Sequence, residues 1–597
     1  MSHGLLSKFP HDNFRYGQKY LTKKLDQAVK SDKVDFVIVE APTGFGKTAV
    51  AGAIGHHHSP AYYLTEQKIH QDQMMEEFPR VTEIAKGQRN YCCGEERNDC
   101  VDPIPEMQCF RKPGTDKEGA VAAESFQRGE LKWQKGLADP CPYFFAKTKA
   151  MESPIACLNY SYFFNETYYT GGAGTHGGDF GDRKVMICDE AHNIASVMQN
   201  FLTFRVDKSQ GDEEKDGYNF NLVDEIGLEL RDRGERISDW EPWILSDLRS
   251  AVSARLKQVN QEVSRCWENN EEVSYELKDR QDKLDEILCN INRFGSEYSS
   301  QYFDDMDWAV EREYDEEYED LVNVKFTPVS VAPFADRFLF DYADTVIMMS
   351  ATILDFNILM RSLGLKRYED RIFRVKFPSP FDASIRPVEY FDAPSINNKS
   401  WAQTFPKTVQ LIDNICQKPE HVSEKGIIHS VSYENEKVIY NNVSRSVRGR
   451  LLSHGDHNDK SREEVLEEFK KSKEPKILMS PAMYEGVDLK YDLSRFQIVP
   501  KVPFLSLGSK AVQYKKQKDP QWYDWRTAIR LVQSFGRSVR AEDDYAKTYV
   551  VDGSFNTFIE RNGRFFPDYI YDKDNKDENA LQKGDIRKLL EESYATQ

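Results

Sequence analysis

Short runs of apolar residues recur along the chain, and each ends in a polar or glycine-rich turn. Runs of this length without alternating polar positions are typical of strands buried on both faces, as in parallel sheets covered by helices. The pattern predicts an α/β fold with two such sheets, one before about residue 380 and one after it. The predicted strands are Phe36–Val39, Val185–Cys188, Thr345–Met349, Gly426–Ile428, Ile477–Met479 and Tyr549–Val551.

A different periodicity occurs between Asp207 and Asp320. Apolar residues there are three and four positions apart, which is the spacing of a packed helix face. The repeat occurs on both sides of the polar stretch Glu268–Glu272 and therefore predicts an antiparallel helical hairpin. We interpret this segment as a solvated helical module without chemistry of its own. The two series are Leu245, Leu248, Val252, Leu256, Val259 and Val263, and then Leu277, Leu284, Leu288 and Ile291.

The charge of the chain is unevenly distributed. A net charge of −18 argues against nucleic acid as a ligand, because phosphate binding needs a basic surface. Between Asp207 and Asp320, however, 33 acidic and 14 basic side chains give a net charge of −19, so the rest of the chain is close to neutral. Charge on a separate module is screened beyond about 8 Å at physiological ionic strength. The composition therefore leaves a nucleic-acid ligand open.

The length of the chain and its cysteines further limit the classes of protein to which it can belong. At 597 residues the chain exceeds the roughly 250–300 residues at which single cores stop growing, so several domains are expected. No run approaches the ~20 apolar residues of a membrane span, and residues 1–11 lack the features of a secretory signal. We expect a cytoplasmic protein of prokaryotic type that works as a monomer and binds no membrane. Its ten cysteines are then thiols or metal ligands rather than disulfides.

A phosphate-binding loop follows the first predicted strand. Residues 41–48 read Ala-Pro-Thr-Gly-Phe-Gly-Lys-Thr and precede a predicted helix. Gly44 and Gly46 allow the loop backbone to close around phosphates. Lys47 would reach the β- and γ-phosphates of ATP, and the Thr48 hydroxyl would hold Mg²⁺. Ala41 stands where the strict pattern has glycine, which is a departure that the helicase form of the motif tolerates.

Acidic residues follow the second predicted strand. Asp189 at the strand tip can bind Mg²⁺, and Glu190 can orient and deprotonate the attacking water. Near the other end of the chain, residues 533–540 are predicted to lie on one helix. Gln533, Arg537 and Arg540 would then project from a single face. Arginines on a second domain can neutralise charge on the γ-phosphoryl group.

The ordered set of motifs resembles superfamily 2 helicases. It comprises the phosphate loop, Asp189–His192, Ser350-Ala351-Thr352, Glu485-Gly486-Val487-Asp488 and the segment from Gln533 to Arg540. The resemblance implies that Gly486 and Asp488 face the nucleotide, and that Ser350 and Thr352 couple hydrolysis to movement. Upstream, residues 14–18 are similar to the segment that cradles adenine in this group, with Arg15 and Gln18 as candidate contacts.

Cysteines gather between residues 86 and 158, with Cys92, Cys93, Cys100, Cys109 and Cys141 at irregular spacing. The spacing alone leaves an iron–sulfur cluster, zinc and inert buried thiols open. Residues 86–93, 139–144 and 156–162 resemble the XPD family of iron–sulfur helicases, whose close relatives are DinG-like helicases. The resemblance implies a [4Fe-4S] cluster held by Cys93, Cys100, Cys109 and Cys141, with an exchange of Cys92 for Cys93 left open.

The same resemblance implies an organisation and a function for the whole chain. Motor domain 1 would comprise residues 1–85, 159–206 and 321–380, interrupted by the cluster domain 86–158 and a helical Arch domain 207–320. Motor domain 2 would comprise residues 381–597. The implied activity is ATP-dependent 5′-to-3′ movement on single-stranded and forked DNA, in nucleotide excision repair. The alternatives are a DinG-like helicase for other DNA structures and a redox-responsive DNA-binding protein with a vestigial ATPase.

Basic and aromatic residues that could bind a single strand of nucleic acid occur in two regions. Exposed rings can stack on bases while lysines and arginines follow the backbone, although core packing is the preferred interpretation for each single ring. The triplet His56-His57-His58 could bind a metal, but we favour a helix end. One region contains Lys510, Tyr514, Lys515, Lys516, Lys518, Trp522, Tyr523, Trp525 and Arg526, and the other Tyr91, Phe110, Arg111, Lys112, Trp133, Tyr143 and Phe144.

Overall fold

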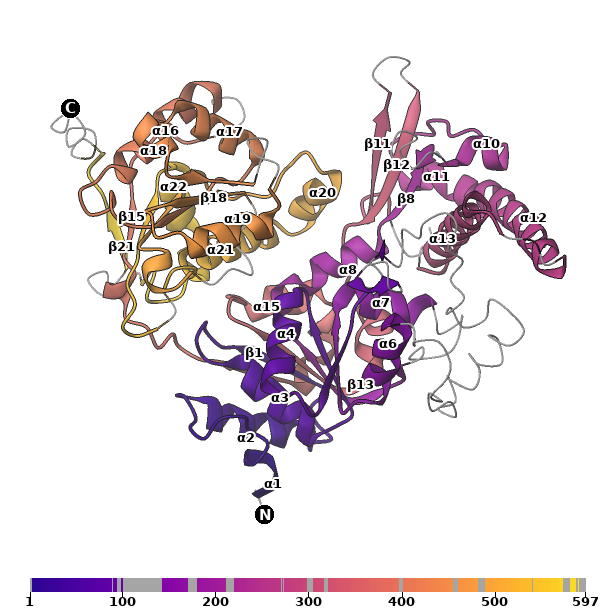
Figure 1. Cartoon of the computed structure of the whole chain (residues 1–597), viewed down its shortest axis with the longest axis horizontal. Helices are drawn as coiled ribbons and strands as arrows, with labels where there is room; N and C mark the ends of the chain where they lie inside the picture. Colours follow the sequence, from indigo (N-terminus) through magenta and orange to yellow (C-terminus); the bar gives the residue numbers. More distant parts are fainter. Residues whose placement is uncertain are drawn as a thin grey trace.

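The protein folds into two α/β domains and a third, mainly helical domain (Figure 1). We keep for the two α/β domains the names motor domain 1 and motor domain 2 that the resemblance suggests. The computed structural model describes residues 3–87, 90–93, 98–99, 142–169, 180–210, 220–269, 271, 273–297, 304–315, 320–396, 401–454, 460–481, 489–539, 541–572, 580–586 and 589. None of the helices in those ranges combines the length and apolar composition needed to cross a bilayer.

Motor domain 1 is built on seven parallel strands in the order β14-β1-β13-β7-β2-β6-β3. Their central members are buried on both faces, as the apolar runs predicted. The strands are β1 (Phe36–Glu40), β2 (Ala61–Thr65), β3 (Thr82–Ala85), β6 (Ile155–Asn159), β7 (Arg183–Cys188), β13 (Ala343–Ser350) and β14 (Ile372–Lys376).

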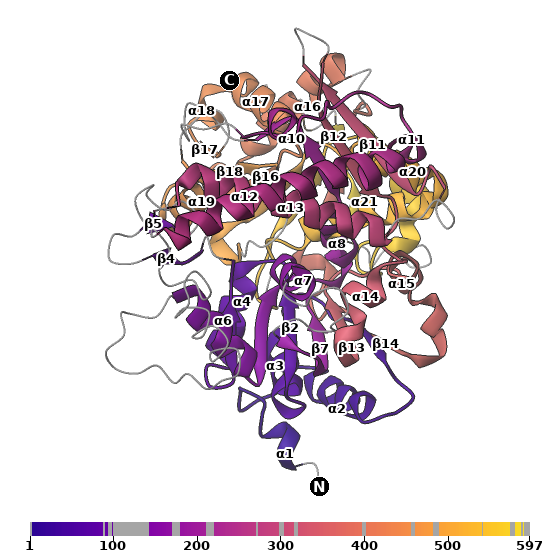
Figure 2. The same ribbon diagram turned by 90° about the vertical axis from the view of Figure 1, so that its right-hand side faces the viewer.

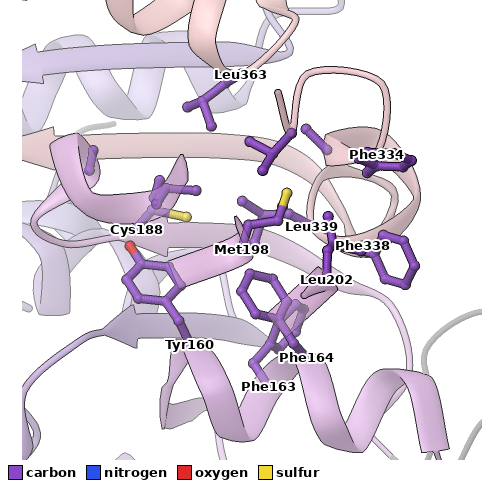
Figure 3. Close-up of a cluster of buried hydrophobic side chains, with 14 of the residues drawn as sticks. Tyr160, Phe163, Phe164, Cys188, Met198, Leu202, Phe334, Phe338, Leu339 and Leu363 are labelled. Carbon is purple, nitrogen blue, oxygen red and sulfur yellow. The ribbon is translucent and has the colours of Figure 1, made fainter. Parts of the chain in front are cut away.

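Alternate residues of these strands supply two cores, one on each face of the sheet. Val37 and Val39 lie in the core covered by α2 (Gln18–Val29), α3 (Lys47–His57) and α4 (Lys68–Glu77). Phe36 and Ile38 lie in the opposite core, with α6 (Pro142–Glu152), α7 (Tyr160–Tyr169), α8 (Ile194–Leu202), α14 (Ala335–Phe338) and α15 (Phe356–Ser362). Figure 3 shows Tyr160, Phe163 and Phe164 of α7 beside Cys188 of β7 and Met198 and Leu202 of α8.

Motor domain 2 repeats the design with strands in the order β17-β18-β16-β19-β20-β15-β21, again all parallel. The predicted α/β class with two parallel sheets is therefore confirmed. The strands are β15 (Val388–Tyr390), β16 (Gly426–His429), β17 (Leu451–Leu452), β18 (Ile477–Ser480), β19 (Phe496–Val499), β20 (Lys547–Val550) and β21 (Leu581–Lys583). The helices are α16 (Trp401–Cys416), α17 (Tyr433–Asn442), α18 (Arg445–Arg448), α19 (Arg462–Lys471), α20 (Lys510–Lys518), α21 (Pro520–Phe535) and α22 (Ser554–Asn562).

The acidic segment contains the predicted hairpin, formed by α12 (Arg249–Glu268) and α13 (Tyr275–Glu297). Figure 2 shows the two helices side by side across the molecule. Val252 and Val259 of α12 face Leu284 and Ile291 of α13 in one core, and all four are fully buried. The hairpin continues from α10 (Leu222–Ile226), α11 (Ile237–Pro242) and a π-helical turn, Trp243–Leu248.

An antiparallel sheet that the sequence analysis missed supports the hairpin. It consists of β8 (Phe204–Asp207), β11 (Trp308–Tyr314) and β12 (Leu321–Pro328), in the order β11-β12-β8. Phe326 and Trp308 of this sheet pack against Phe294 of α13. We call residues 204–328, hairpin and sheet together, the Arch, with wider bounds than the expected 207–320 because β8 begins at Phe204 and β12 ends at Pro328.

Motor domain 2 contacts the Arch through α20, which lies against β11 (Figure 1). Lys518 forms ion pairs with Asp307 at 2.5 Å and with Asp304 at 3.3 Å. The backbone N–H of Lys510 donates to Glu311 Oε1 at 2.9 Å. Ala511 is buried between the two units beside Ala309. We call this contact the α20 clasp.

Candidate nucleotide site between the motor domains

The phosphate loop joins β1 to α3, as predicted. Gly44 and Gly46 have φ angles of 82° and 78°, in the left-handed region that other residues rarely adopt. A Cβ on Gly46 would also come within 2.5 Å of the Gln18 amide nitrogen. Lys47 begins α3, and its Nζ donates to the carbonyl of Ala41 at 3.3 Å. The loop can therefore present backbone N–H groups and one ammonium to a phosphate chain.

Arg15 and Gln18 hold the phosphate loop by its carbonyl groups. Gln18 Nε2 donates to Phe45 O at 2.7 Å and to Gly46 O at 3.3 Å, and Gln18 Oε1 accepts from the backbone N–H of Arg15. Arg15 Nη1 donates to Gly44 O at 2.7 Å. A surface pocket beside them is lined by residues 10–15 and Gln18. The two predicted adenine contacts are therefore placed against the loop and beside a pocket.

Asp189 follows β7 and is nearly buried. Tyr63 Oη donates to Asp189 Oδ2 at 2.9 Å, and Nδ1 of His70 lies 3.6 Å from the same oxygen. Burial raises the pKa of Asp189, and the negative charge of Glu190 adds to the shift, against the opposing effects of His70 and Lys47. A divalent cation would relieve this cost of burying the carboxylate.

Glu190 has an uncommon backbone conformation, with φ 50° and ψ 47°. Such a left-handed geometry costs a non-glycine residue about 1–3 kcal/mol and is found mostly at functional sites. Burial opposes ionisation of Glu190, but His192, Lys47, His70 and Arg537 outweigh it and hold its pKa below the usual range. The carboxylate is therefore ionised, and it can accept a hydrogen bond from the attacking water.

A chain of hydrogen bonds runs from Glu190 across the cleft. Ser350 Oγ donates to Glu190 Oε2 at 3.3 Å, and the same Oγ lies 2.8 Å from His192 Nδ1. The other ring nitrogen of His192 lies 2.9 Å from Gln533 Nε2, in motor domain 2. Gln533 donating to His192 Nε2 fits an imidazole that carries its proton on Nδ1 and donates it to Ser350. The order Gln533–His192–Ser350–Glu190 thus links both motor domains to the proposed base.

Arg537 faces the same carboxylate from motor domain 2. It is only 8% exposed, and its charge lowers the pKa of Glu190. The prediction that residues 533–540 share one helix is wrong, because α21 ends at Phe535. Gly536 caps the helix by donating to Val532 O and Ser534 O, and glycine is a poor helix former. Arg537 therefore enters the cleft from the turn that follows the helix.

Helix α21 also binds motor domain 1 through residues for which the sequence predicted no contact between the domains. Arg526, 8% exposed, donates from Nη1 to the carbonyl of His192 at 2.7 Å. Trp525 Nε1 donates to Ile353 O at 2.7 Å, and Arg361 forms an ion pair with Asp519 at 3.1 Å. The aromatic and basic composition of this helix predicted that it binds a nucleic-acid strand. The structure instead buries Trp525 and Arg526 between the domains.

Glu40, the last residue of β1, is a further buried group that the sequence did not single out. Its Oε2 accepts from the backbone N–H of Leu354 at 3.0 Å, and its Oε1 lies 3.4 Å from Lys376 Nζ. Leu354 has a φ of 63°, so the turn after Ser350-Ala351-Thr352 is strained. Glu40 therefore connects the strand before the phosphate loop to this turn.

Several predicted site residues lie outside the described ranges. Gly486, Asp488 and Arg540 are among them, as are Cys100, Cys109 and Cys141. The backbone of Cys92 and Cys93 forms the short strand β4, paired with β5 (Asn98–Asp99). Cys157 and Cys188 are fully buried in the motor core, and burial raises the pKa of both thiols, which makes them packing residues.

Most of the other residues that were predicted to bind a nucleic-acid strand pack against other parts of the protein instead. Trp522 and Tyr523 are buried, with Lys515 and Lys516 over their rings at 4.6 and 4.1 Å. Tyr143 is buried as well and donates to Glu166 at 3.0 Å. For these rings the core-packing interpretation holds. Phe110, Arg111, Lys112 and Trp133 lie outside the described ranges.

Comparisons with known proteins agree with this geometry. The family profile DEAD_2 matches residues 72–210, and the helicase C-terminal domain profile matches residues 415–572. A solved structure titled XPD_Helicase is 14% identical and covers 96% of this chain and 100% of its own, with a TM-score of 0.59. S. tokodaii Xpd4 is also 14% identical with the same coverage and a TM-score of 0.53. A third, XPD_APO, is 12% identical, covers 95% and 100%, and has a TM-score of 0.55. No curated protein sequence matches significantly.

Two parallel-sheet domains, the first with a phosphate loop, together with the two matched helicase profiles identify an ATP-dependent helicase. The chain contains both of these matched helicase domains, and its fold is similar to that of the solved XPD structures.

Proposed function

We propose that the protein moves 5′-to-3′ on single-stranded DNA and unwinds forked duplexes, driven by ATP bound between its motor domains. The observation that carries the proposal is the geometry around Glu190, which a chain of hydrogen bonds connects to Gln533 of motor domain 2. Lys47 from motor domain 1 and Arg537 from motor domain 2 both lower the pKa of this one carboxylate. A triphosphate between them would contact positive charge from both domains, so its hydrolysis would change how the domains are held together.

Each residue of the cleft has a proposed role in hydrolysis. Lys47 neutralises the β- and γ-phosphates, within the loop shaped by Gly44 and Gly46. Thr48 and Asp189 would hold Mg²⁺, which polarises the phosphoryl oxygens when bound. Glu190 orients the attacking water and accepts its proton, and Arg537 neutralises the charge that develops on the γ-phosphoryl group. On the family resemblance, Arg15 and Gln18 contact adenine, while Gly486, Asp488 and Arg540 complete the site from motor domain 2.

The hydrogen-bond chain supplies a physical link from chemistry to movement. Protonation of Glu190 during hydrolysis would remove the negative charge that accepts the Ser350 hydrogen bond. Ser350 and His192 would then rearrange, and Gln533 would lose its fixed partner. A contact between domains that depends on the protonation state of the base would open and close once in each catalytic cycle.

The proposed DNA machinery rests on the resemblance to XPD helicases. Cys93, Cys100, Cys109 and Cys141 are proposed to hold a [4Fe-4S] cluster, which would make the cluster domain a rigid wedge at the fork. A role in nucleotide excision repair, as a cytoplasmic monomer, is proposed on the same basis.

Unwinding of duplexes with a 5′ or a 3′ single-stranded tail tests the proposal. The purified protein should separate only the 5′-tailed duplex, should require ATP and Mg²⁺, and should contain about four iron atoms per chain, as a [4Fe-4S] cluster requires. Hydrolysis should be stimulated by single-stranded DNA and less by RNA of the same sequence. Separation of only the 3′-tailed duplex would reverse the proposed direction, and hydrolysis stimulated by RNA alone would replace the proposed substrate.

A further inference from the structure

The two helices that begin at the nucleotide site end together at a cluster of metal-binding side chains. Helix α2 begins at Gln18 and α3 begins at Lys47, both at the phosphate loop. Asp26 lies in the last turns of α2, His57 is the last residue of α3, and His58 is its C-cap. Over 11 residues, α3 spans about 16 Å, so the cluster is remote from the nucleotide.

The two separations between Asp26 and the histidines are close to those that a tetrahedral ion requires. Asp26 Oδ1 lies 2.9 Å from His58 Nε2 and 3.5 Å from His57 Nε2. All three ligand atoms lie within 4.8 Å of one another. Metal–ligand bonds of about 2.0–2.1 Å at tetrahedral angles place neighbouring ligand atoms about 3.3 Å apart. The two measured separations bracket that value.

A hydrogen bond accounts for only part of the cluster. His58 and Asp26 are at hydrogen-bond distance, but 3.5 Å is longer than the usual N–H···O separation for His57. The two rings meet at 80° with centroids 4.7 Å apart, and both present Nε2 to the same carboxylate oxygen. An ion shared by all three groups would explain why His57 also points there.

The electrostatic surroundings favour a cation at this place. The C-terminal ends of helices carry partial negative charge, and here two of them meet beside a carboxylate. An ammonium group is already attracted to it, since Lys30 Nζ lies 2.7 Å from Asp26 Oδ1. The side chains of Asp26, His57 and His58 are 17%, 25% and 9% exposed, so a water molecule can reach the ion as a fourth ligand.

We propose that Asp26, His57 and His58 bind one Zn²⁺, which joins the ends of α2 and α3. Two imidazoles and one carboxylate suit zinc better than the all-oxygen preference of Mg²⁺ or Ca²⁺. Because α2 supplies Gln18 and α3 supplies Lys47, the ion stabilises the helix pair that presents the phosphate loop. The proposal rests on the geometry around Asp26 and does not require the proposed helicase activity. Lys30 competes with the ion for Asp26.

Zinc titration of the untagged full-length protein, after removal of bound metal by chelation, tests the proposal. The parent protein should bind one Zn²⁺ more than His57→Ala, and zinc should raise the Tm of the parent but not that of His57→Ala, because an ion that binds the folded state stabilises it. Lys30→Met should bind zinc several-fold more tightly than the parent, a gain that a purely hydrogen-bonded cluster would not give. His56→Ala, which alters the neighbouring ring that contacts Lys8, is the matched control and should bind zinc as the parent does.

Cobalt substitution distinguishes metal bound at this site from metal bound by cysteine thiolates. Co²⁺ at Asp26, His57 and His58 should give weak visible bands without intense sulfur-to-metal charge transfer, and these bands should vanish in Asp26→Asn. ATP hydrolysis by His57→Ala and Asp26→Asn, measured without zinc, reports that both variants fold. Equal zinc stoichiometry and affinity in the parent and His57→Ala would overturn the proposal.

Discussion

Trp525 of motor domain 2 donates a 2.7 Å hydrogen bond from its indole nitrogen to the backbone carbonyl of Ile353 in motor domain 1. Both residues are buried. Ile353 directly follows Ser350-Ala351-Thr352, and the next residue, Leu354, donates its N–H to Glu40 at the start of the phosphate loop. The turn after Ser350 is therefore held by the phosphate-loop strand on one side and by α21 on the other.

Trp525→Phe should weaken the coupling between hydrolysis and movement. The phenyl ring keeps most of the packing but leaves the Ile353 carbonyl buried without its partner, at a cost of about 1–3 kcal/mol. Unwinding and DNA-stimulated hydrolysis should fall by about tenfold, while the affinity for ATP changes little. Trp522→Phe, on the same helix, is the matched control. Equal behaviour of the two variants in an unwinding assay would argue against the coupling role.

Acidification should weaken Mg²⁺ binding before it slows the chemical step. The pKa of Asp189 is raised and that of Glu190 is lowered, so Asp189 takes up a proton first as the pH falls. The Mg²⁺ concentration needed for ATP hydrolysis should rise over the pH range in which Asp189 is protonated and Glu190 is still ionised. Saturating Mg²⁺ should restore the rate there, because the cation displaces the proton.

Tyr63→Phe tests whether Asp189 is the group that takes up this proton. The Tyr63 hydroxyl donates to Asp189 and lowers its pKa, so its removal should move the acid limb to higher pH at limiting Mg²⁺. An acid limb that saturating Mg²⁺ does not move would place the critical proton on another group.

Lys518→Glu should release the α20 clasp. The substituted carboxylate would face Asp304 and Asp307, so attraction becomes repulsion. Exposed ion pairs contribute only about 0–1 kcal/mol, so the overall Tm should change little. Hydrogen exchange should increase in α20 and β11 and stay unchanged in the phosphate loop. Lys516→Glu makes the same charge change at a lysine that lies over Tyr523, and it should leave exchange in β11 at the parent level.

Cys141→Ser should lose unwinding more than ATP hydrolysis, if the proposed cluster serves as a wedge. The parent protein should be brown with broad absorbance near ~400 nm, from charge transfer between thiolate and iron. Iron content and absorbance of the variant should fall together. Colourless parent protein that contains stoichiometric zinc in place of iron would contradict the cluster assignment, as would equal loss of both activities in the variant.

Local patterns in the sequence were sufficient for much of the fold. Continuous apolar runs predicted strands β1, β7 and β13, because strands buried on both faces leave no polar positions. The three- and four-residue spacing predicted α12 and α13. The strands β11 and β12 were missed because the charge of the surrounding segment favoured a helical interpretation, and because Trp308, Ala309 and Val310 are all buried and show no alternation.

Contacts between distant residues could not be predicted in the same way. The spacing of Gln533, Arg537 and Arg540 fitted a helix, but Gly536 ends α21 and turns Arg537 into the cleft. Arg526 reaches the carbonyl of His192, which is 334 positions away along the chain. Asp26 joins His57 and His58 only because α2 and α3 pack side by side. Such contacts depend on how the elements assemble, which residue spacing does not encode.

ATP turnover by Arg537→Ala tests the central claim most directly. The account predicts that kcat falls by about 10³-fold or more, as for the loss of an arginine that neutralises the γ-phosphoryl group, while the affinity for ATP changes far less. Lys47→Ala should also abolish turnover and leave DNA binding measurable. Arg530→Ala, in helix α21 just before the turn that carries Arg537, removes an arginine that donates to the carbonyl of Pro503 and should retain the parent rate. Turnover by Arg537→Ala within a few-fold of the parent rate would contradict a nucleotide gripped from both motor domains.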